Sequence, residues 1–230
     1  IADHQPGGAA GLPDAAYVPD VPWPVESLLL LDDATLLAGQ GGYAAGRMTG
    51  IVQRLQADGT AVAGFAPVTC DDTILALARL DDGRWLAAGA FVKVNGREVP
   101  AMARFDDRGE LDESFHPFAG IHGDPAAPTS AWIEDLLALP DGSVLAAGSF
   151  RLPGESAQDR AIVRVTASGQ IDSDYAQGLR RGASAYTVVS CPAGGHWIGV
   201  YDMMFGVWRL FEDGAGDPRF VPPAALLGSA

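Results

Sequence analysis

Acidic side chains are the most abundant groups in the chain that could do chemistry. The 230 residues include 29 Asp and Glu against 15 Lys and Arg, which gives a net charge of −14. Three adjacent pairs, Asp32-Asp33, Asp81-Asp82 and Asp106-Asp107, fall at expected hairpin turns, where an Asp side chain hydrogen-bonds its own backbone. Glycoside hydrolysis would need one carboxylate in an apolar environment, and Glu134 and Asp135 are the nearest candidates. No sequence feature separates an acid from a base, so we predict no catalytic residue.

Metal and phosphate chemistry have weak candidates. The segment 213–217 holds two carboxylates, Asp213 and Asp217, fewer than a calcium loop requires. His116, His122 and Asp124 share one loop that could form a metal clip, with a solvated loop as the alternative. The glycine-rich run 39–42 resembles a phosphate cradle in composition but lacks the lysine and the following helix. We therefore predict neither a metal nor a cofactor.

Charge and cysteine content exclude further classes. An acidic chain is repelled by phosphate backbones and anionic lipids, so nucleic acid is not an expected partner. No run reaches the roughly 18 apolar residues that a spanning helix needs, so we predict no membrane insertion. Cys70 and Cys191 are too few and too distant for a disulfide framework or a zinc site. We expect two separate thiols.

Four arginines recur at equivalent positions and indicate a repeated architecture. They recur at steps of 50, 60 and 45 residues, each in an apolar extended run that precedes a turn glycine. Each unit then closes on an aromatic residue. The repeated positions are Arg54, Arg104, Arg164 and Arg209, with Phe65, Phe115, Tyr175 and Phe220 as the closing aromatics. A charge in the same strand register needs hydrogen-bond partners. We expect carbonyls of the adjoining turn or tail aspartates (Asp112, Asp172, Asp217) in a structural role, with a ligand-binding ring around a central channel as the alternative.

The clearest unit runs from Ile133 to Tyr175. It predicts a strand, a tight turn at Pro140-Asp141-Gly142, a second strand, a third strand ending near Val165, and a short fourth extended piece. Similar units span 25–65, 74–115 and, in degenerate form, 185–220. A glycine is expected after the second strand in units one to three (Gly39, Gly89, Gly148), whereas unit four carries Tyr201 there.

Repeats of this length predict an all-β fold. A meander with one buried face must pack against its neighbours, and radial packing gives a β-propeller, whereas linear packing gives a β-solenoid with generally shorter coils. We predict a propeller of about four antiparallel meander repeats, with a longer array or larger ring as a further option. The expected divisions are 1–24 (tail of a preceding repeat or closing strand), 25–72, 73–132 (with a long linker), 133–184 and 185–230.

Units two and three resemble the bacterial delta-60 repeat family of β-propellers. The similarity rests on LDDGRWLAAGAF with ARFDDRGELDESF, and on LPDGSVLAAGSF with VRVTASGQIDSDY. It implies a propeller module of large bacterial surface or secreted proteins, or of phage tails, without assigned catalytic residues. Unit one departs from the pattern at Asp33-Ala34, where the turn glycine is replaced.

Function is expected in the segments that break the repeat, because loops on a rigid scaffold carry recognition. Excursions occur at 41–50, 92–99 and 152–160. Tyr, Trp and Arg anchor interfaces, so Tyr43, Arg47 and Trp132 are the candidate partner contacts, with packing on a neighbouring blade as the alternative. We predict a non-catalytic structural or protein-binding module whose partners are protein subunits of an extracellular, cell-surface or phage tail assembly. A carbohydrate-binding propeller with a glycan partner is the second hypothesis, and a hydrolase with a channel active site is the third.

Overall fold

The described strands form four antiparallel sheets. The computed structural model describes residues 19–120, 130–152, 159–177, 179, 182–202 and 204–220. Blade 1 contains β1 (Val25–Leu30), β2 (Leu36–Ala44), β3 (Arg47–Leu55) and β4 (Val68–Cys70), extended by β7 (Lys93–Val94) and β8 (Arg97–Glu98). Blade 2 contains β5 (Ile74–Arg79), β6 (Trp85–Gly89) and β9 (Met102–Phe105). Blade 3 contains β10 (Ser130–Ala138), β11 (Val144–Arg151), β12 (Arg160–Val165) and β13 (Ile171–Asp172), and blade 4 contains β14 (Ser184–Ser190), β15 (His196–Asp202) and β16 (Met204–Leu210).

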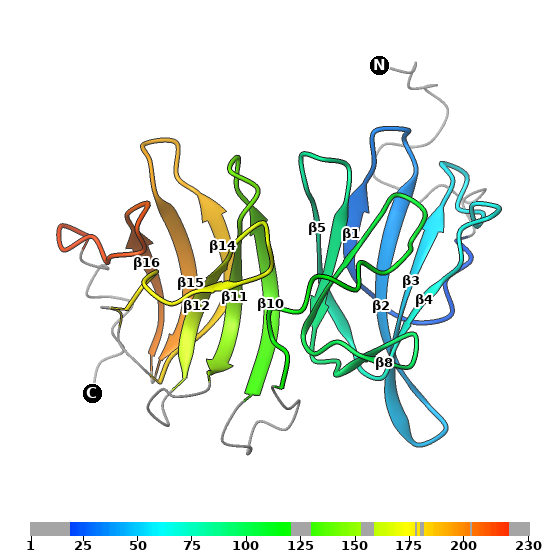
Figure 1. Cartoon of the computed structure of the whole chain (residues 1–230), viewed down its shortest axis with the longest axis horizontal. Coiled ribbons are helices and arrows are strands. Elements are labelled where there is room, and N and C mark those ends of the chain that lie inside the picture. The colour runs from blue at the N-terminus through cyan, green and yellow to red at the C-terminus, as the bar shows by residue number, and fades with distance from the viewer. Residues whose placement is uncertain are drawn as a thin grey trace, which may run out of the picture.

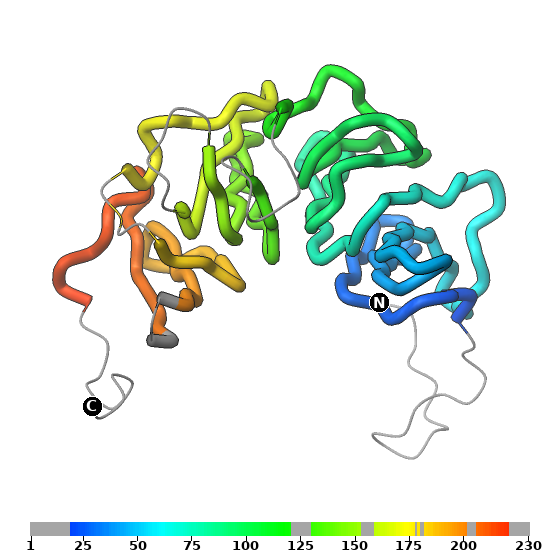
Figure 2. Tube along the Cα trace, turned by 90° about the horizontal axis from the view of Figure 1, so that it is seen from below, coloured from blue at the N-terminus to red at the C-terminus, as the bar shows by residue number. Residues whose placement is uncertain are grey.

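The blades stand side by side along an open arc (Figures 1 and 2). The first strands of neighbouring blades, β1, β5, β10 and β14, contact one another in series, and the later segments of each blade lie on the outside of the arc (Figure 2). Within the described residues no helix is long and apolar enough to cross a membrane. The prediction of an all-β, propeller-like fold of meander blades is confirmed, and the four blades of the described part do not close a ring.

The first hairpin of each blade is built by its turn residues. Gly83, Gly142 and Gly194 adopt positive φ, and Ala34 takes the same left-handed conformation at φ 62° in blade 1. The aspartate before the turn glycine accepts the backbone N–H two residues later, as Asp141 does from Ser143 at 3.0 Å. Asp33 and Asp82 make the equivalent bond, so these carboxylates shape the turns.

Each first strand carries a bulge, at Glu26, Leu75, Glu134 and Tyr186. In blades 2 and 3 the bulge brings a backbone carbonyl against the second strand. A Cβ on Gly89 would lie 2.1 Å from the carbonyl oxygen of Thr73, and one on Gly148 would lie 1.9 Å from that of Trp132, so no larger residue fits without a shift.

The predicted equivalence of Gly39 with Gly89 and Gly148 is wrong by one residue. Gly39 pairs with Ser27, after the bulge, whereas Gly89 and Gly148 pair with Ile74 and Ile133, before it. Gln40 holds the register of the two glycines in blade 1, and Val200, not Tyr201, holds it in blade 4. Gln40 is buried through polar contacts, since its amide accepts from Trp23 N and donates to Gln53.

A hairpin from the second repeat completes blade 1. Val94 of β7 pairs with Cys70 of β4, and Asn95 Oδ1 accepts the backbone N–H of Thr69 at 2.9 Å. Asp71 Oδ1 accepts the N–H groups of Val92 and Lys93. Residues 73–132, expected to form one repeat, therefore supply strands to two sheets.

The hydrophobic core lies between blades. One cluster joins blades 1 and 2, including Leu37, Val52 and Trp85, which stacks on Phe105 at 4.3 Å. A second joins blades 2 and 3, and a third joins blades 3 and 4. Because each sheet buries at least one face against a neighbouring sheet, stability depends on the junctions between repeats.

Candidate functional site

The closing aromatics bind each blade to the next. The glycines of the second turns face these rings: a Cβ on Gly109 would lie 2.8 Å from the Phe65 ring, one on Gly169 would lie 2.9 Å from Phe115, and one on Gly214 would lie 2.9 Å from Tyr175. All three glycines have positive φ between 81° and 87°. The glycine thus serves two needs at once, a left-handed turn and space for the aromatic ring of the preceding blade.

Two of the repeated arginines extend across the same junctions. Arg54 donates to the Asp107 carbonyl oxygen of blade 2 at 2.8 Å, and Arg104 donates to the Ala167 carbonyl oxygen of blade 3 at 2.7 Å. The Arg104 guanidinium also lies 4.2 Å from the centroid of the Phe115 ring. The expected partners, turn carbonyls, are found for these two residues, and the carbonyls belong to the following blade.

Each of the four repeated arginines also forms an ion pair with an aspartate of its own blade. In two blades this aspartate lies in the tail, and in the other two it lies in the first turn. Arg104 and Arg209 pair with the tail aspartates Asp112 and Asp217. Arg54 and Arg164 pair instead with the first-turn aspartates Asp33 and Asp141. For Arg164, the expectation of Asp172 is wrong, because Asp141 and Ser143 hold its guanidinium.

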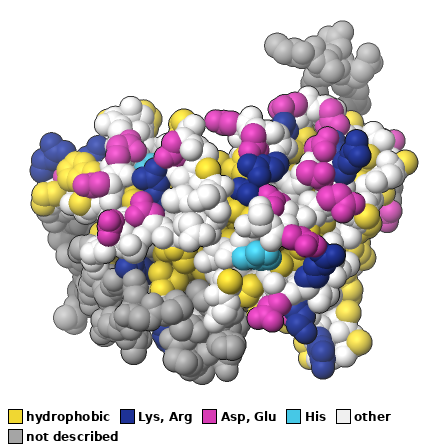
Figure 3. Space-filling model, in the orientation of Figure 1, with side chains coloured by type: hydrophobic (Ala, Val, Ile, Leu, Met, Phe, Trp, Pro, Cys, Tyr) yellow, Lys and Arg dark blue, Asp and Glu magenta, His cyan; other side chains and the backbone are white. Residues whose placement is uncertain are grey.

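The tail aspartates are held in the charged form. Burial opposes ionisation of Asp112, but hydrogen bonds from Ser114 and Arg104 lower its pKa to about 2. Hydrogen bonds from Arg219, together with Arg209, likewise lower the pKa of Asp217 to about 2. Figure 3 shows acidic and basic side chains interspersed along the edge that carries the hairpin turns.

The three predicted contact residues are not brought into one site. Tyr43, at the end of β2, is 66% exposed, and Arg47 begins β3 across the same hairpin and is also exposed. Trp132 lies on β10, is 41% exposed and lines a cavity between blades 3 and 4.

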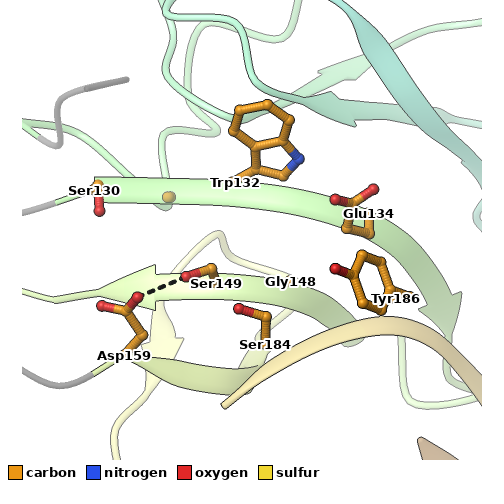
Figure 4. A pocket seen from close by; sticks show the side chains of 9 residues that line it. Ser130, Trp132, Glu134, Gly148, Ser149, Asp159, Ser184 and Tyr186 are labelled. Atoms are coloured by element: carbon orange, nitrogen blue, oxygen red, sulfur yellow. Dashed lines mark hydrogen bonds between the residues drawn. The ribbon is translucent and has the colours of Figure 1, made fainter. Parts of the chain in front are cut away.

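This cavity has a volume of about 210 Å³. Its aromatic and acidic side chains are Trp132, Glu134, Asp159 and Tyr186, and Ser130, Ser149 and Ser184 add hydroxyl groups. Figure 4 shows the Glu134 carboxylate between the Trp132 indole and the Tyr186 ring, with Asp159 hydrogen-bonded to Ser149 at 2.9 Å. Tyr186 was missed by the sequence reasoning. It occupies the bulge position of β14, as Glu134 does in β10, and a bulge redirects its side chain.

Glu134 and Asp135, the candidate acid pair, lie in different surroundings. Burial raises the pKa of Glu134, partly offset by a hydrogen bond from Trp132. Asp135 faces blade 4, where it accepts hydrogen bonds from Thr187 Oγ1 at 2.8 Å and Val188 N at 2.9 Å. Asp135 therefore ties two first strands together and does not line the cavity with Glu134.

The other candidates have structural contacts. Asp213 accepts the N–H of Ala215 within its own turn, and Asp217 is bound by Arg209 and Arg219. His116 contacts the Glu113 carbonyl oxygen, whereas His122 and Asp124 lie outside the described residues. The run 39–42 belongs to β2 and opens no helix.

The two cysteines lie far apart in different blades. Cys70 is buried in β4, and burial raises its pKa. Cys191 follows β14, where a hydrogen bond from the Ala193 backbone lowers its pKa. Both are free thiols.

The outer faces of the two end blades are apolar and open. On blade 1, Leu28 and Leu30 are 60% and 68% exposed. On blade 4, Val189 and Val207 are 51% and 41% exposed. Leu28 and Val207 gave no signal in the sequence that distinguished them from core residues, because the residues at their register positions in other blades, Val188 and Ile162 among them, are buried.

A family model of known proteins agrees with this architecture. The model of the "Domain of unknown function (DUF5122) beta-propeller" matches residues 77–115 and 139–175, the second and third repeats. The chain is a β-propeller domain. A search of the curated proteins finds no match. Among solved structures, a protein of unknown function from Bacteroides caccae is similar with a TM-score of 0.45 and 14% sequence identity, over 89% of this β-propeller chain and 69% of that chain.

Proposed function

We propose that this β-propeller is a non-catalytic structural or protein-binding module of a larger extracellular, cell-surface or phage tail assembly. The observation that carries the proposal is the pair of open apolar faces at the two ends of the arc. Large apolar side chains that share one exposed sheet face mark interaction sites on soluble proteins. Leu28 and Leu30 point to one such face, and Val189 and Val207 to the other.

A protein surface suits these faces better than a small ligand. Each face is a β-sheet surface whose counterparts inside the chain pack against another sheet. Packing of sheet on sheet requires a partner with side chains that interdigitate over an extended area. The acidic chain, with its net charge of −14, favours basic or neutral partners.

A capture experiment with matched variants tests the proposal. Wild type, Leu28→Glu, Val207→Glu and Met48→Glu would be immobilised and exposed to solubilised surface or tail proteins. Met48 is a matched control for Val207, because both are 41% exposed. Met48 lies on the β2–β3 hairpin of blade 1, on the same side of β3 as Val52, which packs toward blade 2 and not toward the open face. We expect defined proteins to be retained by wild type and the control and to be lost from at least one face variant. Equal retention by all four chains would contradict the role of the faces.

Carbohydrate binding is the second candidate, favoured by the cavity at Trp132. An aromatic ring beside carboxylates and hydroxyls offers the mixture of apolar surface and placed polar groups typical of ligand sites. Its volume of about 210 Å³ is below the roughly 300 Å³ at which pockets for drug-sized ligands begin, so it would take one small polar unit. The positions equivalent to Trp132 are occupied by Thr73 in blade 2 and by Ser184 in blade 4. Because neither residue is aromatic, a sugar site of this kind would not repeat in those blades.

A glycan array compares this candidate directly with the first. Saturable binding to one sugar class by wild type and by Tyr43→Ala, together with loss in Trp132→Ala and Tyr186→Ala, would place carbohydrate binding above protein binding. Absence of binding across the array, or binding that is unaffected by both cavity variants, would remove the second candidate.

A further inference from the structure

We infer that a second copy of this chain packs on both open faces, so that two four-blade arcs close one ring of eight blades. The inference deepens the proposed protein-binding function by naming the first partner. It follows from a comparison of each open face with the equivalent faces inside the chain.

The open face of blade 1 is the face that every other blade packs against its predecessor. Leu28 pairs with Ala38, and its register equivalents pair in the same way in the other blades: Leu77 with Ala87, Leu136 with Ala146 and Val188 with Ile198. Leu77 is partly buried against the core between blades 1 and 2. Leu136 is 9% exposed in the core between blades 2 and 3, and Val188 is 3% exposed between blades 3 and 4. Leu28 is 60% exposed. We call this surface, marked by Leu28 and Leu30, the leading face.

The open face of blade 4 is the opposite kind. Val207 lies two residues before Arg209 on the third strand, the position of Val52, Met102 and Ile162 in the other blades. Those three side chains are 0%, 0% and 1% exposed, because each packs on the following blade, whereas Val207 is 41% exposed. We call this surface, marked by Val189 and Val207, the trailing face. A trailing face and a leading face are the two halves of each junction in the chain.

Residues that make specific contacts at the junctions inside the chain have equivalents in blades 1 and 4. Gly59 of blade 1 has φ +88°, as do its equivalents Gly109, Gly169 and Gly214 within a few degrees, and those three glycines receive the closing aromatic of the preceding blade. Arg209 would face the Ala57 carbonyl of the other copy, the position that Arg54 and Arg104 bind in the next blade.

The described chain before β1 leaves the leading face open. Asp20 N donates to the Gly59 carbonyl oxygen and Trp23 N donates to Gln40, yet Leu28 and Leu30 stay more than half exposed. The blades already follow an open arc (Figure 2). Propellers typically close with about four to eight blades, and two copies give eight. Head-to-tail junctions close when the rotation returns to the start, which two copies achieve with two identical junctions.

Molar mass in solution tests the inference. Sedimentation velocity and light scattering should give twice the 23.9 kDa chain mass for wild type, and for the Met48→Glu control. Leu28→Glu damages both junctions of a ring, and so does Val207→Glu, so each variant alone should be monomeric. A mixture of the two variants has one junction with both faces intact, so it should recover two-copy species in which the two chains are different. Circular dichroism would verify that each variant remains folded.

Three results would overturn the inference. Wild type could remain a monomer at about 100 μM, well above the dissociation constant of a standard-size interface. Loss of association in Leu28→Glu but not in Val207→Glu would indicate pairing of two leading faces. A mixture of the two variants that stays monomeric would exclude a head-to-tail junction. If one of these results is found but other proteins are still retained through the same faces, the proposed function is supported and this inference is wrong. If the chain self-associates as expected but retains no other protein, this inference is supported and the wider protein-binding role is not.

Discussion

The closing aromatics offer the sharpest test of how the blades are joined. Phe115 and Phe220 occupy the same repeat position, but a described blade follows Phe115, whereas Phe220 is the last residue that the structure describes. Phe115 is 2% exposed, lies against Gly169 and carries the Arg104 guanidinium 4.2 Å from its ring centroid. Phe220 is partly exposed and packs edge-on against Trp197 at 4.7 Å.

These environments predict different costs for the same substitution. Removal of a buried phenylalanine side chain destabilises a protein by about 3–5 kcal/mol, and the lost cation–π contact, worth about 0.5–2 kcal/mol, is one part of that cost. We therefore expect Phe115→Ala to lower the free energy of unfolding by about 3–5 kcal/mol. For Phe220→Ala we expect about 1 kcal/mol, the value of a partly exposed aromatic pair.

Urea unfolding, followed by tryptophan fluorescence and circular dichroism, measures the difference. Both substitutions would be made in the Leu28→Glu background, so that the proposed junction between copies does not bury Phe220. A lower slope of the unfolding curve would indicate that blades unfold separately, as repeat proteins can. Equal losses for Phe115→Ala and Phe220→Ala would refute the reasoning, because burial by the next blade would then make no contribution.

Three further predictions concern single positions. Ala34→Gly should stabilise the protein by about 0.5–1 kcal/mol, raising Tm, because Ala34 holds a left-handed conformation that Gly83 adopts without strain in blade 2; no change or a decrease would contradict the turn assignment. Arg104→Lys should cost about 1–3 kcal/mol in urea unfolding, since a lysine cannot bind Asp112 and the Ala167 carbonyl together, and an unaffected midpoint would argue against this bridge. His196 is 3% exposed, and burial lowers its pKa, so the unfolded chain takes up this proton at a higher pH than the folded one. Stability should therefore fall as pH drops below about 6.5, and His196→Val should reduce that loss in thermal unfolding at pH 5 relative to pH 7.5; an identical pH dependence would exclude His196 as a cause.

Turn chemistry and repeat spacing made the blades predictable. Asp141-Gly142 and the runs of apolar residues around it specify a hairpin locally, because a turn depends on residues adjacent in the chain. The recurrence of Arg54, Arg104, Arg164 and Arg209 then identified equivalent strands, and the register of each arginine against the second strand is the same in all four blades.

Contacts between residues that are distant in the sequence could not be predicted in the same way. Arg164 pairs with Asp141 and not with Asp172. The two aspartates have the same chemistry, so only their positions in space decide which one binds the arginine. The pairing of β7 with β4 joins segments of two repeats, and the Gly39 register depends on a bulge one strand away. The Trp132 cavity needs Tyr186, which is distant in sequence and carries no motif.

The sequence by itself determined that this protein is a series of antiparallel meanders with equivalent turns, since alternation and turn propensity act over a few residues. Tertiary structure alone decided which aspartate each arginine binds, which side chains form the cavity, and which apolar faces remain open. Those outcomes depend on how one sheet is placed against the next, and Leu28 and Val188 have the same register while only the second is covered by a preceding blade.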